Sequence, residues 1–91
     1  MPIKVTTVFT FKIKTTFNKW KELFDSEDSY RRLSAFDINP LFRGQSIKDP
    51  QQVIVIHQGP EGNMQKFFEK NGSWIATHGV QVSTIKVSDW S

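Results

Sequence analysis

The order of predicted elements along the 91 residues indicates an α+β fold of the ferredoxin-like type. Two strand–helix–strand segments follow one another, which gives β-α-β-β-α-β. Right-handed crossovers interleaved in this way place the strands in one antiparallel sheet, in the order 4-1-3-2, with both helices on one face. The segment 53–56, Val-Ile-Val-Ile, is apolar on both faces of its strand. One helix layer covers only one face, so the sequence predicts a partner chain.

The first half of the chain shows a change of hydrophobic period. Alternation with a period of two, in β-branched and aromatic residues, predicts the first strand over 3–14. Apolar residues three to four positions apart then predict a helix over 17–34. Ser26 is placed to cap a second helical segment, so the helix is expected to be kinked there.

The two middle strands are separated by turn chemistry. The second strand is predicted over 36–48, with Pro40 tolerated only at an edge or a bulge. Asp49-Pro50 suits the first two positions of a turn, and the third strand runs from about Gln52 to Gln58. The first and third strands are the most apolar, which agrees with their central place in the predicted sheet.

Glycine and proline divide the second half of the chain. The second helix is predicted to open at Gly59-Pro60-Glu61, with the proline in its first turn. Asn71-Gly72-Ser73 is predicted to end this helix before one further turn, and Gly79 to stop that turn. The fourth strand begins at Val80, and 88–91 are expected to be a short tail.

Composition limits the class of protein. We expect one domain over 1–91, with a core filled by eight Phe, three Trp and one Tyr. The absence of cysteine excludes disulfides, thiolate metal sites and a cysteine nucleophile, and fits a reducing compartment. No apolar run approaches the ~18 residues of a membrane span. Residues 1–4 are interpreted as the start of a strand, not as a signal peptide.

The net charge of +3 is spread over the chain. It predicts a solvated surface and no specific binding of nucleic acid. RNA-recognition modules with the same element order carry stacking aromatic residues on the third strand, and 53–57 has none. The only loose basic cluster consists of Lys12, Lys14, Lys19 and Lys21.

His57 is the main candidate for chemistry, because it follows a buried strand and could titrate near neutral pH. If it faces the helices, it lines the cleft between them and the sheet and could act as an acid or base. Arg43 could pair with Asp37 or anchor an anionic ligand, and Tyr30 could place its hydroxyl in the cleft. Five aromatic residues are predicted to be core first and cleft wall second: Trp20, Phe24, Phe67, Phe68 and Trp74.

Other motifs are absent. Two histidines without a third ligand of matching spacing predict no metal site. No phosphate loop or dinucleotide motif occurs, so no cofactor is predicted. No Ser-His-Asp order and no carboxylate pair suited to acid–base catalysis can be picked out.

Several segments carry a family resemblance. The Asp49-Pro50 turn before Val53–Ile56, the Phe-rich helix from Met64 to Lys70 and Gly79-Val80 resemble the dimeric α+β barrel superfamily. That superfamily is the fold of antibiotic-biosynthesis monooxygenases, muconolactone isomerase and stress-responsive barrel proteins. The resemblance implies a homodimer and a cytoplasmic setting.

A closer resemblance rests on segments 6–13, 34–44 and 53–58. These segments are similar to a family of short uncharacterised proteins from cyanobacteria. That family has no assigned activity, so the resemblance implies a fold and a setting without a mechanism.

Two function classes remain open. The favoured one is a homodimer that binds a small apolar or aromatic ligand in an aromatic-walled cleft between helices and sheet. The alternative is a small cofactor-independent enzyme, monooxygenase- or isomerase-like, with His57 as acid or base. The first is favoured because the sequence shows no convergent catalytic set. A cleft filled by Phe and Trp side chains would contradict both.

Overall fold

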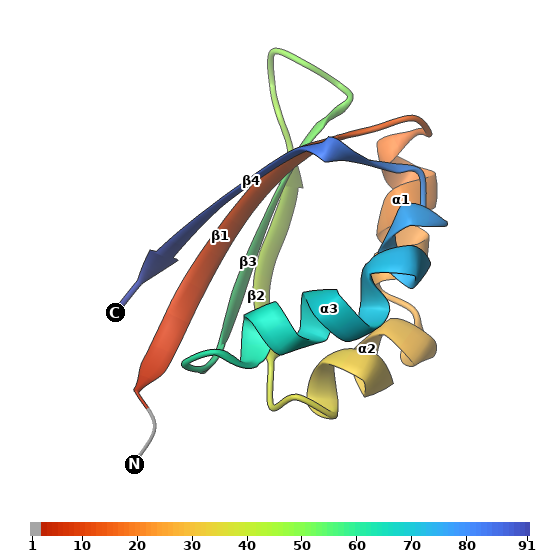
Figure 1. Cartoon of the computed structure of the whole chain (residues 1–91). Coiled ribbons are helices and arrows are strands. Elements are labelled where there is room, and N and C mark those ends of the chain that lie inside the picture. The colour runs from red at the N-terminus through yellow and green to blue at the C-terminus, as the bar shows by residue number, and fades with distance from the viewer. Residues whose placement is uncertain (1–2) are drawn as a thin grey trace.

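The computed structural model describes residues 3–91, which form a four-stranded antiparallel sheet with all helices on one face (Figure 1). The strands lie in the order β2-β3-β1-β4, which is the predicted 4-1-3-2 read from the other edge. The predicted ferredoxin-like α+β fold is therefore confirmed. Met1 and Pro2, assigned to the start of the first strand, lie outside the described residues. The elements are β1 (Lys4–Ile13), α1 (Phe17–Phe24), α2 (Glu27–Ser34), β2 (Asn39–Gln45), β3 (Gln52–Pro60), α3 (Asn63–Ala76) and β4 (Val80–Trp90).

The segment predicted as one helix over 17–34 forms two helices. α1 begins after Thr16, whose hydroxyl accepts a hydrogen bond from the backbone N–H of Lys19 at 3.3 Å. α2 begins after Ser26, whose hydroxyl accepts from the N–H of Ser29 at 3.2 Å. Each cap satisfies an N–H group that has no partner inside its helix. The predicted kink at Ser26 is therefore a complete break.

The second strand is shorter than the predicted 36–48. Its first residues instead form a turn, in which the Asp37 N–H donates to the carbonyl oxygen of Ser34 at 3.0 Å. Asp37 also has a φ of 56°, in the left-handed region that an extended strand does not use. β2 is an edge strand whose register shifts between Pro40 and Phe42. The proline thus lies at an edge and beside a bulge, as predicted.

The predicted helix end at 71–73 is wrong, because α3 continues through it to Ala76. Asn71 is buried there, and its Nδ2 donates to the carbonyl oxygen of Phe67 at 3.2 Å. Its Oδ1 accepts from Arg32 Nη1 of α2 at 2.8 Å. Asparagine by itself favours a turn. Here one hydrogen bond within α3 and one from Arg32 of α2 hold it inside the helix.

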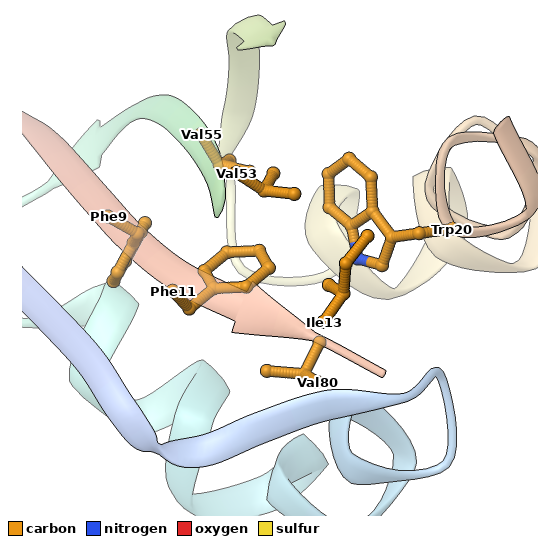
Figure 2. Close-up of a cluster of buried hydrophobic side chains, with 7 residues drawn as sticks. All are labelled: Phe9, Phe11, Ile13, Trp20, Val53, Val55 and Val80. Carbon is orange, nitrogen blue, oxygen red and sulfur yellow. The ribbon is translucent and has the colours of Figure 1, made fainter. Parts of the chain in front are cut away.

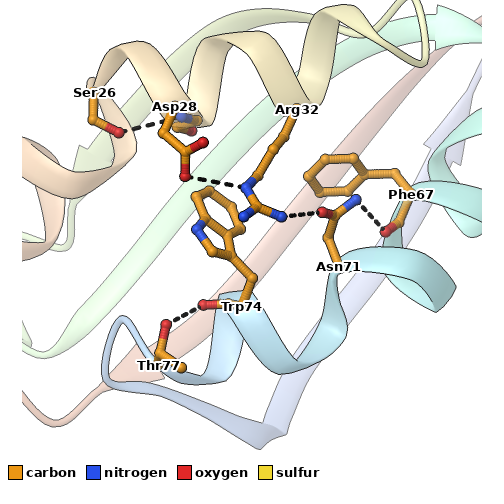
Figure 3. Close-up of polar contacts among 8 residues, drawn as sticks. Ser26, Asp28, Arg32, Phe67, Asn71, Trp74 and Thr77 are labelled. Atoms are coloured by element: carbon orange, nitrogen blue, oxygen red, sulfur yellow. Dashed lines mark hydrogen bonds and ion pairs between the residues drawn. The ribbon is translucent and has the colours of Figure 1, made fainter.

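Arg32 joins α2 to α3 (Figure 3). Besides Asn71, its guanidinium contacts Asp28 Oδ2, 3.1 Å from Nε, and lies 4.6 Å from the centroid of the Trp74 ring. The arginine therefore combines an ion pair, a charge-assisted hydrogen bond and a cation–π contact. This arrangement fixes the two helices side by side over the sheet.

Both ends of α3 depend on a glycine. Pro60 lies in β3 and not in the first turn of the helix, which begins after Gly62, with a φ of 84°. Gly79 follows α3 with a φ of 80°, and a Cβ atom there would lie 3.2 Å from Thr15 Cγ2. Its predicted role as a stop signal is confirmed.

β4 is longer than predicted. The segment 88–91, expected to be a tail, continues the strand to Trp90, which pairs with Thr6 of β1. The β1–β4 register shifts between Thr10 and Lys12. β4 therefore forms one edge of the sheet, and it ends beside the start of β1 (Figure 1).

The core lies between the sheet and the helices. Alternate residues of β1 and β3 face the helices, and Trp20 of α1 packs against them (Figure 2). Leu33, Ile38 and Phe67 form a second cluster beneath α2 and α3. Burial of each such side chain contributes roughly 1.5–3 kcal/mol. The main cluster consists of Phe9, Phe11, Ile13, Trp20, Val53, Val55 and Val80.

The opposite side of the sheet carries apolar side chains without a covering layer of helices. We call it the outer sheet face, defined by Val8, Phe42, Ile54, Ile56 and Trp90, which share one face by strand register. The rings of Phe42 and Trp90 are 53% and 62% exposed. Of the apolar residues of β3, Val53 and Val55 therefore lie in the core, and Ile54 and Ile56 lie on the outer sheet face.

Candidate functional site

Two cavities lie on the helix side of the sheet. The inner one, where the aromatic-walled cleft was expected, holds only about 60 Å³, room for a water or two but not for an organic ligand. Aromatic side chains fill this cleft, so both expected functions are contradicted as far as they were placed there. The second is an open cavity of about 540 Å³ beside the first half of α3, which we call the groove. Its volume is in the usual range for small-molecule sites. The groove is lined by residues that include Thr7, Phe9, His57, Met64, Phe68, Val87 and Asp89.

Strand register brings the polar groups of the groove into one row across the sheet. Thr7 of β1 pairs with His57 of β3 on one side and with Asp89 of β4 on the other. Directly paired residues present their side chains to the same face, which here is the helix face. The neighbouring row is apolar and consists of Val55, Phe9 and Val87.

His57 lies at the boundary between the groove and the inner cavity, and lines both. Only 5% of it is exposed, because the rings of Phe9 and Phe24 pack on the imidazole, each with a centroid distance of 5.7 Å. This burial lowers the pKa of His57 from its ordinary value near 6.5 to about 4. The imidazole is therefore uncharged at neutral pH.

The Nδ1 atom of His57 is buried and has no hydrogen-bond partner among residues 3–91. Leaving such a nitrogen unpaired costs about 1–3 kcal/mol. Native structures keep few buried polar atoms in this state, and those that remain often mark a place where a ligand or water binds. This atom is the strongest sign of a binding function in the groove.

Asp89 and Thr7 form the polar end of the row. The Thr7 hydroxyl donates to Asp89 Oδ1 at 2.8 Å. The threonine is buried, whereas the carboxylate lies at the exposed mouth of the groove. The hydroxyl thereby holds the carboxylate in place while its own lone pairs remain able to accept.

All five aromatic residues predicted for the cleft line the inner cavity. Phe68 also lines the groove, whereas the other four, Trp20, Phe24, Phe67 and Trp74, do not. Trp20 and Phe67 are each 3% exposed and belong to the core clusters, while Trp74 packs against Arg32. The expectation that they are core first agrees with this placement.

Tyr30 and Arg43 lie away from both cavities. Tyr30 is 62% exposed, so its hydroxyl is on the outer surface and not in the cleft as expected. Arg43 was expected to pair with Asp37, but its Nη2 lies 2.6 Å from Asp25 Oδ2 at the α1–α2 junction. Asp37 lies in the turn before β2, where its backbone N–H donates to the carbonyl oxygen of Ser34.

Sequence reasoning missed Thr7 and Asp89. Thr7 appears as one more position in an alternating strand, and Asp89 falls in the segment that was interpreted as a tail. Neither side chain forms a motif within the sequence. Only the pairing of β4 along β1 brings residues 82 positions apart into contact.

Two further kinds of site were sought. Within residues 3–91, no group of three or more His, Asp or Glu side chains is placed to hold a metal ion. None of the helices in the described part of the chain is long and apolar enough to cross a membrane.

The comparison with protein families identifies the chain. The model of the domain of unknown function DUF3764 matches residues 3–91. The chain belongs to this family. No protein of known, curated function matches the DUF3764 chain.

Solved structures share the fold of this DUF3764 protein at low sequence identity. A NIPSNAP family protein from Agrobacterium tumefaciens has a TM-score of 0.67 and 9% identity, covering 98% of this chain and 92% of that chain. SnoaB, described as a cofactor-independent oxygenase from Streptomyces nogalater, has a TM-score of 0.63 and 8% identity, covering 97% and 91%. A dimeric ferredoxin-like protein from an uncultured marine organism has a TM-score of 0.55 and 15% identity, covering 98% and 86%. These likenesses establish the ferredoxin-like fold.

Proposed function

We propose that this protein is a single-domain homodimer that binds a small molecule with an apolar or aromatic body in the groove. The observation that carries the proposal is a 540 Å³ cavity lined by His57, a buried side chain whose Nδ1 has no hydrogen-bond partner among the described residues. Phe9 and Phe68, whose rings meet edge to face at 5.0 Å, supply an apolar wall for such a ligand. A hydrogen bond from Nδ1 to a bound ligand or water, in whichever direction the tautomer of the ring allows, would remove the cost of the unpaired nitrogen.

The groove can be tested by filling it. Val87 and Val82 are both on β4 and are 54% and 55% exposed, but only Val87 lines the groove. When naphthylmethanol is titrated into isotope-labelled protein, we expect the backbone amide NMR resonances around Thr7 and His57 to shift. Val87→Trp should abolish these shifts, and Val82→Trp should preserve them. Equal binding by both variants would contradict the groove as the site.

The homodimer is proposed to form through the outer sheet face. Ile54 and Ile56 of β3 and the exposed rings of Phe42 and Trp90 make an apolar surface of the kind that marks interfaces. The dimeric ferredoxin-like neighbour supports the assignment. Pairing of two such faces, sheet against sheet, would bury them in a barrel.

Light scattering tests this interface. The unmodified protein is expected to be a dimer at micromolar concentration, and Ile56→Glu is expected to dissociate it, because a carboxylate would be buried without a partner. Ile47→Glu is the matched control, since Ile47 is fully exposed in the β2–β3 turn and should leave the dimer intact. A monomeric unmodified protein would refute the homodimer.

An enzymatic role is the second candidate. Two observations favour it: a buried, uncharged imidazole that can accept a proton, and the likeness in fold to a cofactor-independent oxygenase. In this role His57 would act as the base toward a bound phenol. Oxygen uptake with dihydroxynaphthalene, lost in His57→Gln, would support it. Oxygen uptake no faster than in buffer alone would contradict the enzymatic role and leave only the binding function.

Three expectations from the sequence stay predictions: the cytoplasmic setting, the closeness to cyanobacterial proteins and the lack of specific nucleic-acid binding. The last has a direct test. Any association with RNA should fall steeply with salt, as counterion release requires. A tight complex with one RNA sequence that survives ~200 mM salt would contradict it.

A further inference from the structure

The inner cavity adjoins the groove. Four side chains line both spaces and so form a wall between them: Phe9, His57, Met64 and Phe68. The inner cavity holds about 60 Å³, and a water molecule takes up about 30 Å³ in the liquid. The space therefore suits one or two very small molecules, and the chemistry of its walls decides which kind.

The walls of the inner cavity are almost entirely apolar. Sixteen residues line it, and thirteen of these are aliphatic, aromatic or methionine, among them Phe11, Trp20 and Val80 (Figure 2). Within the described part of the chain, no Lys, Arg, Asp or Glu belongs to the lining. A buried water typically makes roughly three hydrogen bonds, and cavities with apolar walls stay dry. The composition of the lining therefore favours an apolar occupant over water.

The two histidines of the lining bring no charge into the space. The ring of His57 packs against Phe9 and Phe24, and the ring of His78 packs against Trp74 with a centroid distance of 4.2 Å. Burial lowers the pKa of both histidines, so both are uncharged at neutral pH. At that pH they form part of an aromatic wall.

This wall offers contacts that suit a small apolar molecule. All sixteen lining residues are buried or half-buried, so a guest meets side chains and little solvent. Aromatic rings and the thioether of Met64 are polarizable, and each close contact with them adds dispersion attraction. An apolar guest also has no hydrogen bonds to water that it must give up.

We propose that the inner cavity is a dry site that binds a small apolar gas, and that dioxygen is its physiological occupant. Dioxygen is diatomic and apolar, so it matches both the size and the lining of the space. Bound there, it would lie next to any molecule in the groove, across the wall that the two spaces share. The inference concerns the inner cavity alone and does not depend on a ligand in the groove.

Xenon is the first probe, because it is apolar, is close to dioxygen in size and does not react. Methyl NMR spectra are recorded under increasing xenon pressure on protein labelled at Ile, Leu, Val and Met. We expect saturable shifts at methyl groups of the lining, such as those of Leu33, Ile75 and Ile85. Val82, on β4 outside the lining, is the internal control and should show only a small, linear shift.

Dioxygen itself is detected through its paramagnetism, which speeds the relaxation of nearby nuclei. Oxygen dissolved in the solvent acts most on exposed groups, and Val82 is 55% exposed whereas Leu33 is 3% exposed. Under oxygen pressure we expect the reverse order, with the Leu33 methyl groups relaxing faster than those of Val82. Faster relaxation at Val82 would mean that oxygen reaches the protein only from the solvent, and the proposal would be wrong.

Val55→Ile and Val53→Ile form a matched pair of variants. Both valines lie in the core on β3, at 2% and 0% exposure, but only Val55 lines the inner cavity. The methyl group added in Val55→Ile takes up a large part of the space and should abolish the saturable xenon shifts, whereas Val53→Ile should retain them. Added methyl groups also strain a packed core, so Ile75→Val gives a second test. It removes a methyl group from the lining and should lower the xenon pressure at half-saturation.

A water paired with Nδ1 of His57 is the competing occupant. Cross-relaxation of a long-lived water with the methyl groups of Leu33 and Ile75, without saturable xenon shifts, would overturn the proposal. Equal xenon binding by Val55→Ile and the unmodified protein would do the same. The binding of naphthylmethanol to the groove is measured separately, so a failure of either proposal can be told from a failure of the other.

Discussion

Burial of His57 makes the folded state of this protein less stable as the pH falls. The folded-state pKa of about 4 lies below the ordinary value near 6.5, which applies to the unfolded chain. The unfolded state therefore binds a proton first as the pH falls. The stability from the uncharged histidine is complete above about pH 6.5 and is lost as the pH falls from there to about 4.

The size of the loss follows from the two pKa values. They differ by about 2.5, and each tenfold difference in proton affinity corresponds to ~1.4 kcal/mol, so the full loss is about 3 kcal/mol. By pH 5 it has reached about 2 kcal/mol. Typical domains have unfolding free energies of 5–15 kcal/mol, so a loss of this size is a large fraction.

His57→Leu isolates this effect, because leucine fills a similar volume and does not titrate. Urea unfolding at one protein concentration, at pH 7 and pH 5, gives the free energies of both proteins. Between pH 7 and pH 5, we expect the unfolding free energy of the unmodified protein to fall by about 2 kcal/mol more than that of the variant. Comparing the two proteins cancels the contribution of the carboxylates, which both contain. His78→Leu is the control, since His78 is only partly buried and its replacement should change the decline less.

Equal losses in the unmodified protein and His57→Leu would refute the reasoning. They would mean that His57 takes up a proton in the folded state as readily as in the unfolded chain, and so that it is not buried between Phe9 and Phe24. Titration of the imidazole by NMR gives an independent check. Its resonances should show no protonation above about pH 5.

The remaining predictions concern stability measured by urea unfolding. Arg32→Ala should cost about 1–2 kcal/mol through the lost cation–π and charge-assisted contacts, whereas Arg31→Ala, on the exposed side of α2, should cost almost nothing; equal effects would contradict the helix contact. Gly72→Ala should stabilise α3 by up to ~1 kcal/mol because its Cβ meets open space, while Gly79→Ala should destabilise by about 1–2 kcal/mol at a positive φ; a reversed order would count against these backbone conformations. Trp20→Ala should cost about 3–5 kcal/mol as a core cavity, and a smaller loss would mean that the ring is not packed on the sheet.

Local patterns predicted the elements of this fold and failed where tertiary contacts override them. Period-two alternation and turn residues located β1 and β3, because those signals are encoded within a few neighbouring positions. The end of α3 was misplaced at Asn71, where local preference favours a turn. A single hydrogen bond from Arg32, 39 positions away, helps to hold that asparagine in the helix.

Side-chain period and residue type were enough to predict the order of strands and helices, the apolar character of both faces of β3 and the candidacy of His57. Packing was needed to establish which face of β3 meets the helices, that aromatic rings fill the expected cleft, and that the open volume lies beside β1, β4 and α3. The physical reason is that the row from His57 through Thr7 to Asp89 depends on the register of three strands, which main-chain pairing and core packing set over long sequence distances.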